Sequence, residues 1–186
     1  MQRNLILILC CLALMPGCTT TKGKSGAEKR QAIQQMKNEA LAELYAKKSD
    51  VRAQIANAPG YGVFSNANVY IILAGVGGGY GVVESRRSGK STYMKMGEVG
   101  VGIGAGVKDY RLVLVFHTQD ALEYFVRHGW SFGGQADAAA KAGEKGGAVG
   151  AEGIINNVTV YEMTESGLAL QATIKGTKFW RDDSLN

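Results

Sequence analysis

The sequence predicts one α+β domain in which N-terminal helices pack on a curved, mainly antiparallel, Gly-rich β-sheet or partial barrel. The main observation is a glycine at every second position in two runs, at residues 75–81 and 100–106. Successive side chains of a strand point to opposite faces, so each run leaves one face of bare backbone and one mostly apolar face. Glycine in a strand often marks a close approach by another part of the chain. The 186 residues, 46% of them hydrophobic, are enough for one core.

The first residues are typical of a targeting signal. Arg3 precedes an apolar run at residues 5–14, which is too short to span a membrane and is typical of a secretory signal peptide. The segment that ends in Gly17-Cys18 resembles a bacterial lipoprotein processing site. That resemblance implies cleavage before Cys18 and attachment of diacylglycerol and further acyl chains, such as palmitate, to this residue. An ordinary cleaved signal with a chance cysteine remains the alternative.

We therefore expect residues 1–17 to be the signal peptide, residues 18–26 a lipidated tether and residues 27–186 the folded domain. Cleavage would leave Cys18 as the only mature cysteine, which excludes a disulfide framework and a cysteine metal site. Multiple acylation of Cys18 would give stable membrane anchoring. Thr19, and not an aspartate, follows it; by resemblance to other lipoproteins, this implies the periplasmic face of the bacterial outer membrane.

Two helices are predicted after the tether. Ser25 and Glu28 have the spacing of a capping box. Apolar residues then recur at helical spacing: Ile33, Met36, Ala40, Leu41, Leu44, Val51 and Ile55. Ser49-Asp50 is expected to divide the helices, and Pro59-Gly60 to end the second. The apolar stripe is interpreted as core packing; an amphipathic helix that lies on a membrane or fills the glycine faces is the alternative.

The remainder is mostly β. Strands are expected from Tyr61 onward, with a basic loop at residues 85–90 and a central, fully buried strand at residues 112–116. Thr118 is a candidate cap for a helix that ends before Gly129. Small residues dominate the segment 133–153, for which we expect a mixture of strand and irregular structure. Residues 158–163 and 168–175 are predicted to form a hairpin.

No motif for nucleotide binding or catalysis is complete. Ser88-Gly89-Lys90-Ser91-Thr92 looks like the end of a phosphate-binding loop, but Glu84 occupies the position of the required first glycine. His117 and His128 lack ligand spacing and are interpreted as structural or surface residues, and no G-x-S-x-G is present. The formal charge of +5 falls to a mild +4 without Arg3, and no feature supports nucleic acid as a partner. We expect no enzymatic activity, no catalytic residues, no metal and no cofactor.

The loop at residues 85–90 contains the strongest candidate site. Arg86, Arg87 and Lys90 cluster within five positions, and Lys95, Lys108 and Arg111 are candidate neighbours. We hypothesise that Arg86, Arg87 and Lys90 bind anionic lipid headgroups, since a basic residue near an anionic membrane contributes roughly 1 kcal/mol. A solvated turn between two strands is the alternative interpretation.

Several segments together resemble the SYLF domain family: residues 58–64, the glycine runs at 74–83 and 100–106, Phe116-His117-Thr118, residues 133–137 and Ser166-Gly167-Leu168. The resemblance covers roughly residues 27–178. It implies lipid binding, because eukaryotic members bind phosphoinositides in actin and membrane-trafficking assemblies and bacterial members are generally regarded as lipid-binding. It supplies no catalytic residue. Actin is an implausible partner for a periplasmic lipoprotein, so lipid binding is the only function carried over.

The sequence thus favours a non-enzymatic lipid- or membrane-binding lipoprotein of the bacterial cell envelope, anchored by acylated Cys18. Its expected partner is membrane phospholipid with anionic headgroups. The alternative is a structural scaffold that binds an envelope protein partner through its Gly- and Ala-rich segment, without lipid specificity.

Overall fold

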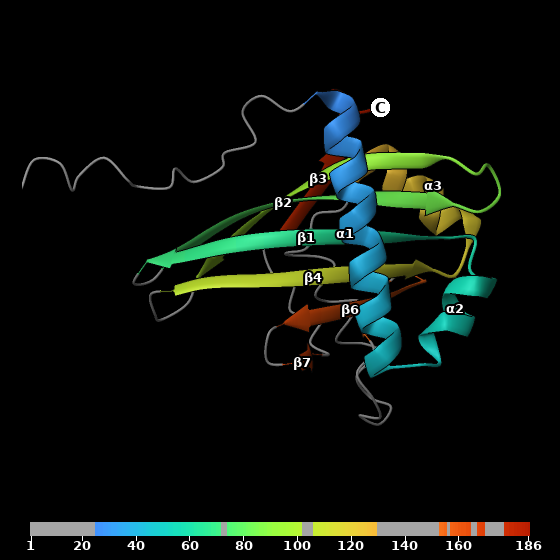
Figure 1. The fold of residues 1–186 in the computed structure, drawn as a ribbon, viewed down its shortest axis with the longest axis horizontal. Helices are drawn as coiled ribbons and strands as arrows, with labels where there is room; N and C mark the ends of the chain where they lie inside the picture. The colour runs from blue at the N-terminus through green and yellow to red at the C-terminus, as the bar shows by residue number, and fades with distance from the viewer. Residues whose placement is uncertain are drawn as a thin grey trace, which may run out of the picture.

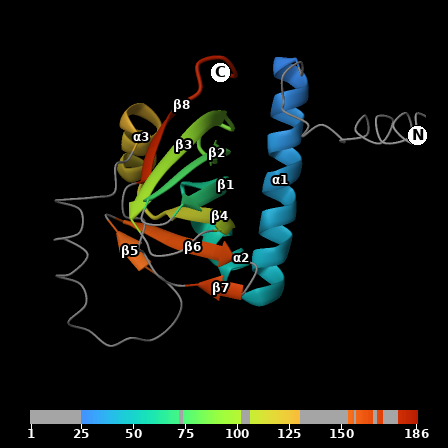
Figure 2. The same cartoon turned by 90° about the vertical axis from the view of Figure 1, so that its left-hand side faces the viewer.

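The computed structural model describes residues 25–71, 74–101, 106–129, 153–155, 157–164, 167–169 and 177–186. Helices cover both faces of one antiparallel sheet: α1 lies across one face and α3 packs on the other (Figures 1 and 2). The predicted α+β class is therefore confirmed. The predictions of a signal peptide at residues 1–17 and of lipid attachment at Cys18 fall outside the described residues.

The helices begin and end where local side chains satisfy their backbone. Helix α1 spans Gly26–Lys47 and starts with the predicted capping box, in which the Ser25 amide donates to Glu28 Oε2 at 2.6 Å. Helix α2 spans Val51–Asn57, and α3 spans Gln119–His128 behind the Thr118 cap. Gly129, with φ of 66°, follows α3 in a conformation that glycine adopts readily. No helix in the described part of the chain combines the length and apolarity needed to cross a membrane.

The sheet has eight strands within the described residues. They are β1 (Gly60–Ile71), β2 (Ala74–Ser85), β3 (Ser91–Val101), β4 (Gly106–Phe116), β5 (Gly153–Ile155), β6 (Val158–Thr164), β7 (Gly167–Ala169) and β8 (Thr177–Arg181). Their order is β5-β6-β4-β1-β2-β3-β8, with β7 also paired to β6, and every pair is antiparallel. The order is open, so β5 and β8 are the edges of this path. The predicted central strand is confirmed, since residues 112–116 of β4 are all buried.

The second glycine run does not form one strand. Gly100 belongs to β3 and Gly106 to β4, and these strands flank the β1–β2 pair on opposite sides. The prediction of a second glycine strand was therefore wrong in its limits, because alternation indicates extended backbone but does not locate where a strand ends. The first run is confirmed as β2.

Each face of the sheet has its own hydrophobic core. The buried stripe of α1, which includes Ile33, Ala40 and Leu44, packs on Val63 and Val82, so the interpretation as core packing is confirmed. The other core joins α3 to the sheet and contains an aromatic cluster of Phe64, Phe116, Phe125 and Phe179. Every member of both cores lies between Ile33 and Leu185, so the chain from Thr19 onward contains all of this packing.

The glycines of β2 make room for side chains of the neighbouring strands. A Cβ at Gly81 would overlap the Phe64 ring, and a Cβ at Gly79 would lie 2.7 Å from Met96 Cγ. Phe64 and Met96 are fully buried in the core that faces α3. At these positions, therefore, the glycine face accepts core side chains from β1 and β3 instead of an amphipathic helix.

The C-terminal strand β8 was not predicted. It extends the sheet beside β3, where its residues pair with Met94 through Glu98. Asn186 then anchors the end of the chain by donating from Nδ2 to the Tyr93 carbonyl at 2.7 Å. The predicted hairpin after Val158 is confirmed for β6 and β7, which pair through Thr164 and Gly167. The predictions for residues 133–152 and 170–175 lie outside the described residues.

Candidate functional site

The basic loop forms the turn between β2 and β3, as predicted. Its ends are joined by the Ser85 amide, which donates to the Lys90 carbonyl at 3.0 Å. Ser88 accepts a hydrogen bond from the Lys90 amide at 3.3 Å, and Gly89 adopts a φ of 63°. Because the turn links two strands and opens no helix, the rejection of a phosphate-binding loop at residues 88–92 is confirmed.

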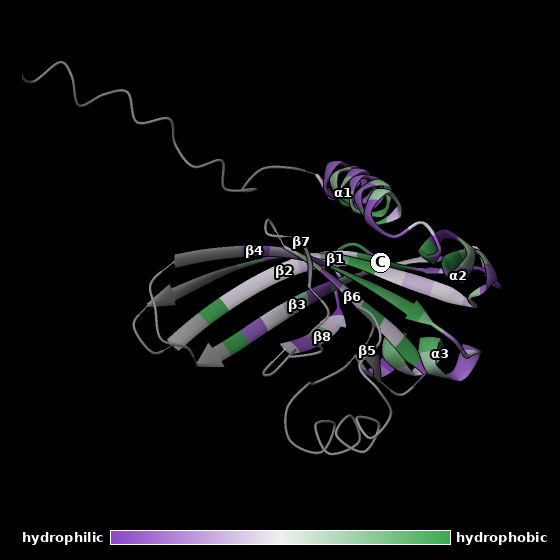
Figure 3. Ribbon diagram, turned by 90° about the horizontal axis from the view of Figure 1, so that it is seen from below, coloured by the Kyte–Doolittle hydropathy of each residue, from purple (hydrophilic) through white to green (hydrophobic). Residues whose placement is uncertain are grey.

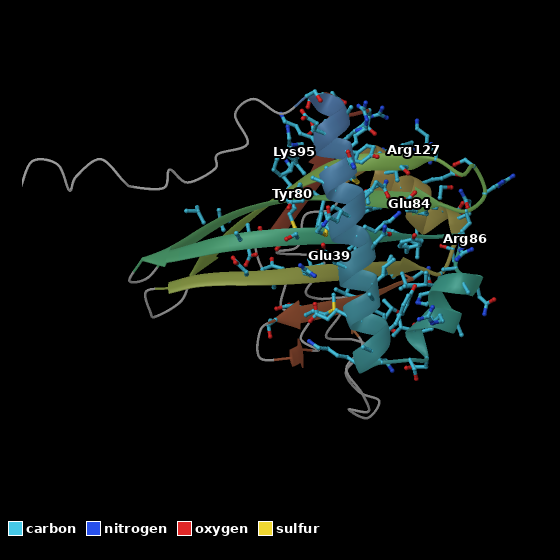
Figure 4. The ribbon with its side chains drawn as sticks, viewed as in Figure 1. Glu39, Tyr80, Glu84, Arg86, Lys95 and Arg127 are labelled. Carbon is cyan, nitrogen blue, oxygen red and sulfur yellow. The ribbon has the colours of Figure 1, made fainter. Side chains whose placement is uncertain are left out.

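The three predicted headgroup-binding residues do not point the same way. Arg86 is turned toward α2: its Nε donates to the Ile55 carbonyl at 3.0 Å and its amide donates to the Pro59 carbonyl at 2.9 Å. Arg87 and Lys90 instead line a pocket of about 490 Å³ between the turn and α3. Figure 4 shows Arg86 beside α2 and Arg127 on α3. Within the loop, Arg86 therefore makes a structural contact with α2, whereas Arg87 and Lys90 line an open pocket.

The pocket, which we call the basic pocket, is lined by three cations, by one acid, Glu123, and by apolar side chains. Arg127 of α3 joins Arg87 and Lys90 among its lining residues, and Val83, Leu122 and Val126 supply the apolar part. Within the described residues, Arg87 and Lys90 have no ion pair or hydrogen bond from their side chains. Arg127 has a loose contact with Glu123 at 3.5 Å. In the part of the chain that the structure describes, the pocket thus contains two cations without a side-chain partner, Arg87 and Lys90, and one weakly paired cation, Arg127.

Arg127 was missed in the sequence. It lies 37 positions after Lys90 and belongs to a helix, so no local pattern connects it to the loop. Conversely, the structure does not bring two suggested neighbours to the pocket. Lys95 pairs with Asp182 at 3.1 Å, and Arg111 contacts Glu43 of α1 at 3.5 Å.

A polar network beside the loop fastens α1 to the sheet. Glu84 accepts hydrogen bonds from Lys37 at 2.8 Å, from Ser91 at 2.7 Å and from Gln34 at 3.2 Å. Burial alone would raise the pKa of Glu84, but the hydrogen bonds from Lys37, Ser91 and Gln34 together lower it below its ordinary value. The Glu84 side chain is only 17% exposed, and both of its carboxylate oxygens accept hydrogen bonds. We interpret this network as structural.

A second polar cluster lies on the face that α3 covers. Glu98 accepts from Asn66 Nδ2 at 2.8 Å and from the Tyr110 hydroxyl. Burial, and then the hydrogen bond to Glu98, raise the pKa of Tyr110, so this phenol stays protonated at all physiological pH values. Tyr110 is therefore not poised for proton transfer near neutral pH.

The histidines sit in separate local contacts. The ring of His117 lies 2.6 Å from Thr159 Oγ1, measured at Nε2, and His128 stacks beside Tyr124 with ring centroids 4.5 Å apart. Among the described residues, no group of three or more His, Cys, Asp or Glu side chains is arranged to hold a metal ion.

Comparison with known proteins supports the resemblance found in the sequence. A family model, Ysc84, described as Las17-binding protein actin regulator, matches residues 97–186. The chain is also 32% identical over 162 residues to Beta cell expansion factor A of Aeromonas veronii. This alignment covers 87% of the present chain and 60% of the relative, so the chain spans less than two thirds of that protein.

Proposed function

The chain belongs to the Ysc84 (SYLF) family, and on this premise we propose that it is a non-enzymatic lipid-binding lipoprotein of the bacterial cell envelope. The observation that supports this function is the basic pocket, where Arg87, Lys90 and Arg127 surround an apolar wall. An anionic phospholipid has the matching chemistry, with a phosphate for the cations and a glycerol–acyl region for the apolar side chains.

The contacts that each cation already makes determine how much we expect it to contribute to headgroup binding. Arg87 and Lys90 can approach a phosphate without first breaking a contact to another described residue. Arg127 gives up an exposed ion pair with Glu123, which is worth little in water, and the hydrogen bond from its Nε to the Glu123 carbonyl at 3.3 Å. Arg86 is part of the predicted headgroup site, but its Nε already donates to Ile55, so we expect a smaller share from it.

Membrane attachment follows from the predicted acylation of Cys18. The tether at residues 18–26 leads directly to the start of α1 at Gly26, so an anchored domain would hang from the N-terminal end of this helix. We propose the periplasmic face of the outer membrane as its location, on the basis of Thr19 after the acylated cysteine.

A vesicle sedimentation experiment tests the pocket. The chain from Thr19 onward, which lacks the anchor, is mixed with vesicles of phosphatidylethanolamine and phosphatidylglycerol. Replacing Arg87, Lys90 and Arg127 with glutamate is expected to weaken binding roughly 100-fold, since each lost surface charge is worth about 1 kcal/mol.

The matched control carries Lys29→Glu, Lys47→Glu and Arg52→Glu, an equal charge change on α1 and α2 and away from the pocket. This control variant should bind the vesicles more tightly than the pocket variant. Equal loss in both variants would show that overall charge, and not the pocket, governs binding.

The family description also favours a second candidate function, because it names a protein-binding activity for relatives of this chain. In this alternative, the protein is a scaffold that binds an envelope protein without lipid specificity. A pull-down with the chain from Thr19 onward distinguishes the two. One stoichiometric partner with no retained phospholipid supports the scaffold, whereas retained phospholipid that is lost in the Arg87/Lys90/Arg127 variant supports lipid binding.

A further inference from the structure

The four long strands continue past the helices to an uncharged end. We call it the hairpin end and define it as residues 69–71, 74–76, 99–101 and 106–107. Strand register places Val107, Val69, Val76 and Val99 in one row across β4, β1, β2 and β3. The next row outward is Gly106, Tyr70, Gly75 and Gly100. No residue of the hairpin end carries a charge.

Two valines of this end, Val76 and Val99, are exposed to solvent. Val76 is 67% exposed and Val99, its direct cross-strand partner, is 63% exposed. Helix α1 lies on the same side of the sheet but packs over Val63 and Val82, farther along the strands. Figure 1 shows the strands extending beyond α1, and Figure 3 shows hydrophobic bands near these ends of β2 and β3. Val76 and Val99 thus place two exposed apolar side chains next to each other at this end.

Aromatic and basic residues lie two to four rows inward of Val76 and Val99. Tyr80 and Trp180 are 47% and 40% exposed, and the Trp180 ring lies 3.2 Å from the position of a Cβ on Gly97. Register places Lys178 beside Gly97 and Lys95 between Tyr80 and Trp180. Tyr, Trp and Lys are the residues that proteins use at the boundary between a membrane and water. Figure 4 shows Tyr80 and Lys95 on the side of α1 away from Glu84 and Arg86.

We propose that the hairpin end inserts into the interfacial layer of a phospholipid bilayer, with Tyr80, Trp180 and Lys178 at the headgroup level. This contact rests on the proposed lipid-binding function, but it uses a surface distinct from the basic pocket.

The pattern of charge favours a bilayer over a protein partner. On the α1 side, the first charged row runs from Asp109 to Lys178; on the α3 side, it runs from Lys108 to Glu98. The strands are therefore uncharged on both faces beyond these rows. A protein docked on a sheet covers one face, whereas a lipid layer surrounds an inserted hairpin on all sides. These two rows carry two lysines, Lys108 and Lys178, and two acids, Asp109 and Glu98, so the boundary has no net formal charge.

The open edges of the sheet limit the depth of insertion. In the described residues, β8 pairs with β3 only as far as Glu98, and β6 pairs with β4 only from Tyr110 onward. The outer backbone groups of Val99 and Val101 thus have no strand partner there, and such groups are not tolerated in hydrocarbon. The hairpin end spans about three residues per strand, or roughly 10 Å. This matches the depth of an interfacial contact of about 5–10 Å.

Insertion at this end separates the bilayer from the basic pocket. Ser85, at the pocket, lies nine residues along β2 from Val76, which is roughly 30 Å of strand. A headgroup in the pocket would consequently belong to a lipid outside the leaflet that receives the hairpin end. The two surfaces therefore cannot meet one leaflet at the same time. Vesicle binding through the pocket predicts a loss in the Arg87/Lys90/Arg127 variant, whereas vesicle binding through the hairpin end predicts a loss in a variant of Val76 and Val99.

The test compares two aspartate variants of the chain from Thr19 onward. Val76→Asp combined with Val99→Asp places charge in the hairpin end, while Tyr124→Asp changes a 56% exposed side chain on α3. Exposure makes all three sites tolerant of substitution, and circular dichroism verifies the fold. With the vesicles used above, the double variant is expected to bind at least about tenfold more weakly and the Tyr124 variant like the parent. In a Trp130→Phe chain, brominated lipids should quench Trp180 most strongly when the bromine lies near the glycerol.

Each outcome decides between the surfaces. If the parent binds vesicles and the double variant binds equally well, the hairpin end is not the membrane contact, and the basic pocket remains. If the double variant abolishes self-association in analytical ultracentrifugation but leaves vesicle binding intact, the valines form a contact between copies and the proposal fails. If the parent ignores the vesicles altogether, both the hairpin contact and the proposed function fail.

Discussion

The two ends of the β2–β3 pair have the same backbone structure but very different surroundings. At the turn, Glu84 is tied to Lys37 and Ser91, and Arg86 is tied to the end of α2. At the other end, the side chains of Val76 and Val99 are exposed to solvent. The glycines of β2 also differ by face, because Gly81 admits Phe64 on the side that α3 covers, whereas Gly78 belongs to the opposite face and meets no atom within 4 Å. The structural role of a residue pattern along a strand therefore depends on which side chains of other elements pack against that strand.

The largest expected effect comes from adding one methyl group to β2 at two places. Gly81→Ala would press its Cβ into the Phe64 ring and the Val63 carbonyl, and should destabilise the protein by about 3 kcal/mol. Gly78→Ala meets no atom within 4 Å and should stabilise the strand by about 0.5 kcal/mol. Urea unfolding of both variants, followed by circular dichroism, measures the difference. Similar midpoints would mean that the two faces of β2 do not differ in packing at these glycines.

An intermediate effect is expected from Glu84→Gln, which weakens the attachment of α1 at the turn end. The substitution leaves Lys37, only 13% exposed, without its charge partner and should cost about 1–3 kcal/mol. Since the folded pKa of Glu84 lies below its ordinary value of 4.5, its contribution is present above that pH and is lost as the pH falls through the folded pKa. The free energies of unfolding of parent and variant should therefore converge on acidification. A difference that stays constant between neutral pH and about pH 3 would contradict this account.

The smallest effect separates two adjacent residues of the basic loop. Arg86→Ala removes the hydrogen bond to Ile55 and should lower the free energy of unfolding by about 1 kcal/mol. Arg87→Ala should leave stability within about 0.5 kcal/mol but weaken vesicle binding roughly fivefold. Unfolding and sedimentation measured on the same two proteins check both halves. If Arg86→Ala weakens vesicle binding as much as Arg87→Ala, both arginines serve the pocket.

Local patterns predicted most of the regular structure. The capping box at Ser25, the helical spacing from Ile33 to Leu44 and the Thr118 cap each depend on residues close together in sequence, so the chain segment itself carries the information. The all-apolar segment of β4 likewise indicates a strand buried on both faces. Strand β8 was missed because its partner, β3, lies far earlier in the chain, and a short edge strand has no periodicity of its own.

The candidate site was predicted only in part. The basic turn is a local feature, and two of its three cations line the basic pocket. The division between Arg86 and Arg87 depends on where α2 ends, and the contribution of Arg127 depends on α3 packing against β1, β4 and β8. Neither the end of α2 nor the position of α3 can be predicted from the residues around the loop.

By itself, the sequence determined the fold class, the helix boundaries, the basic turn and the glycine character of β2, since each depends on neighbours along the chain. Only the tertiary structure decided which glycines are filled by Phe64 and Met96, which arginine reaches the pocket and where Val76 and Val99 remain uncovered. The physical reason is that burial and charge pairing are properties of segments brought together from distant positions. The residue pattern of one segment does not indicate which distant segment will pack against it.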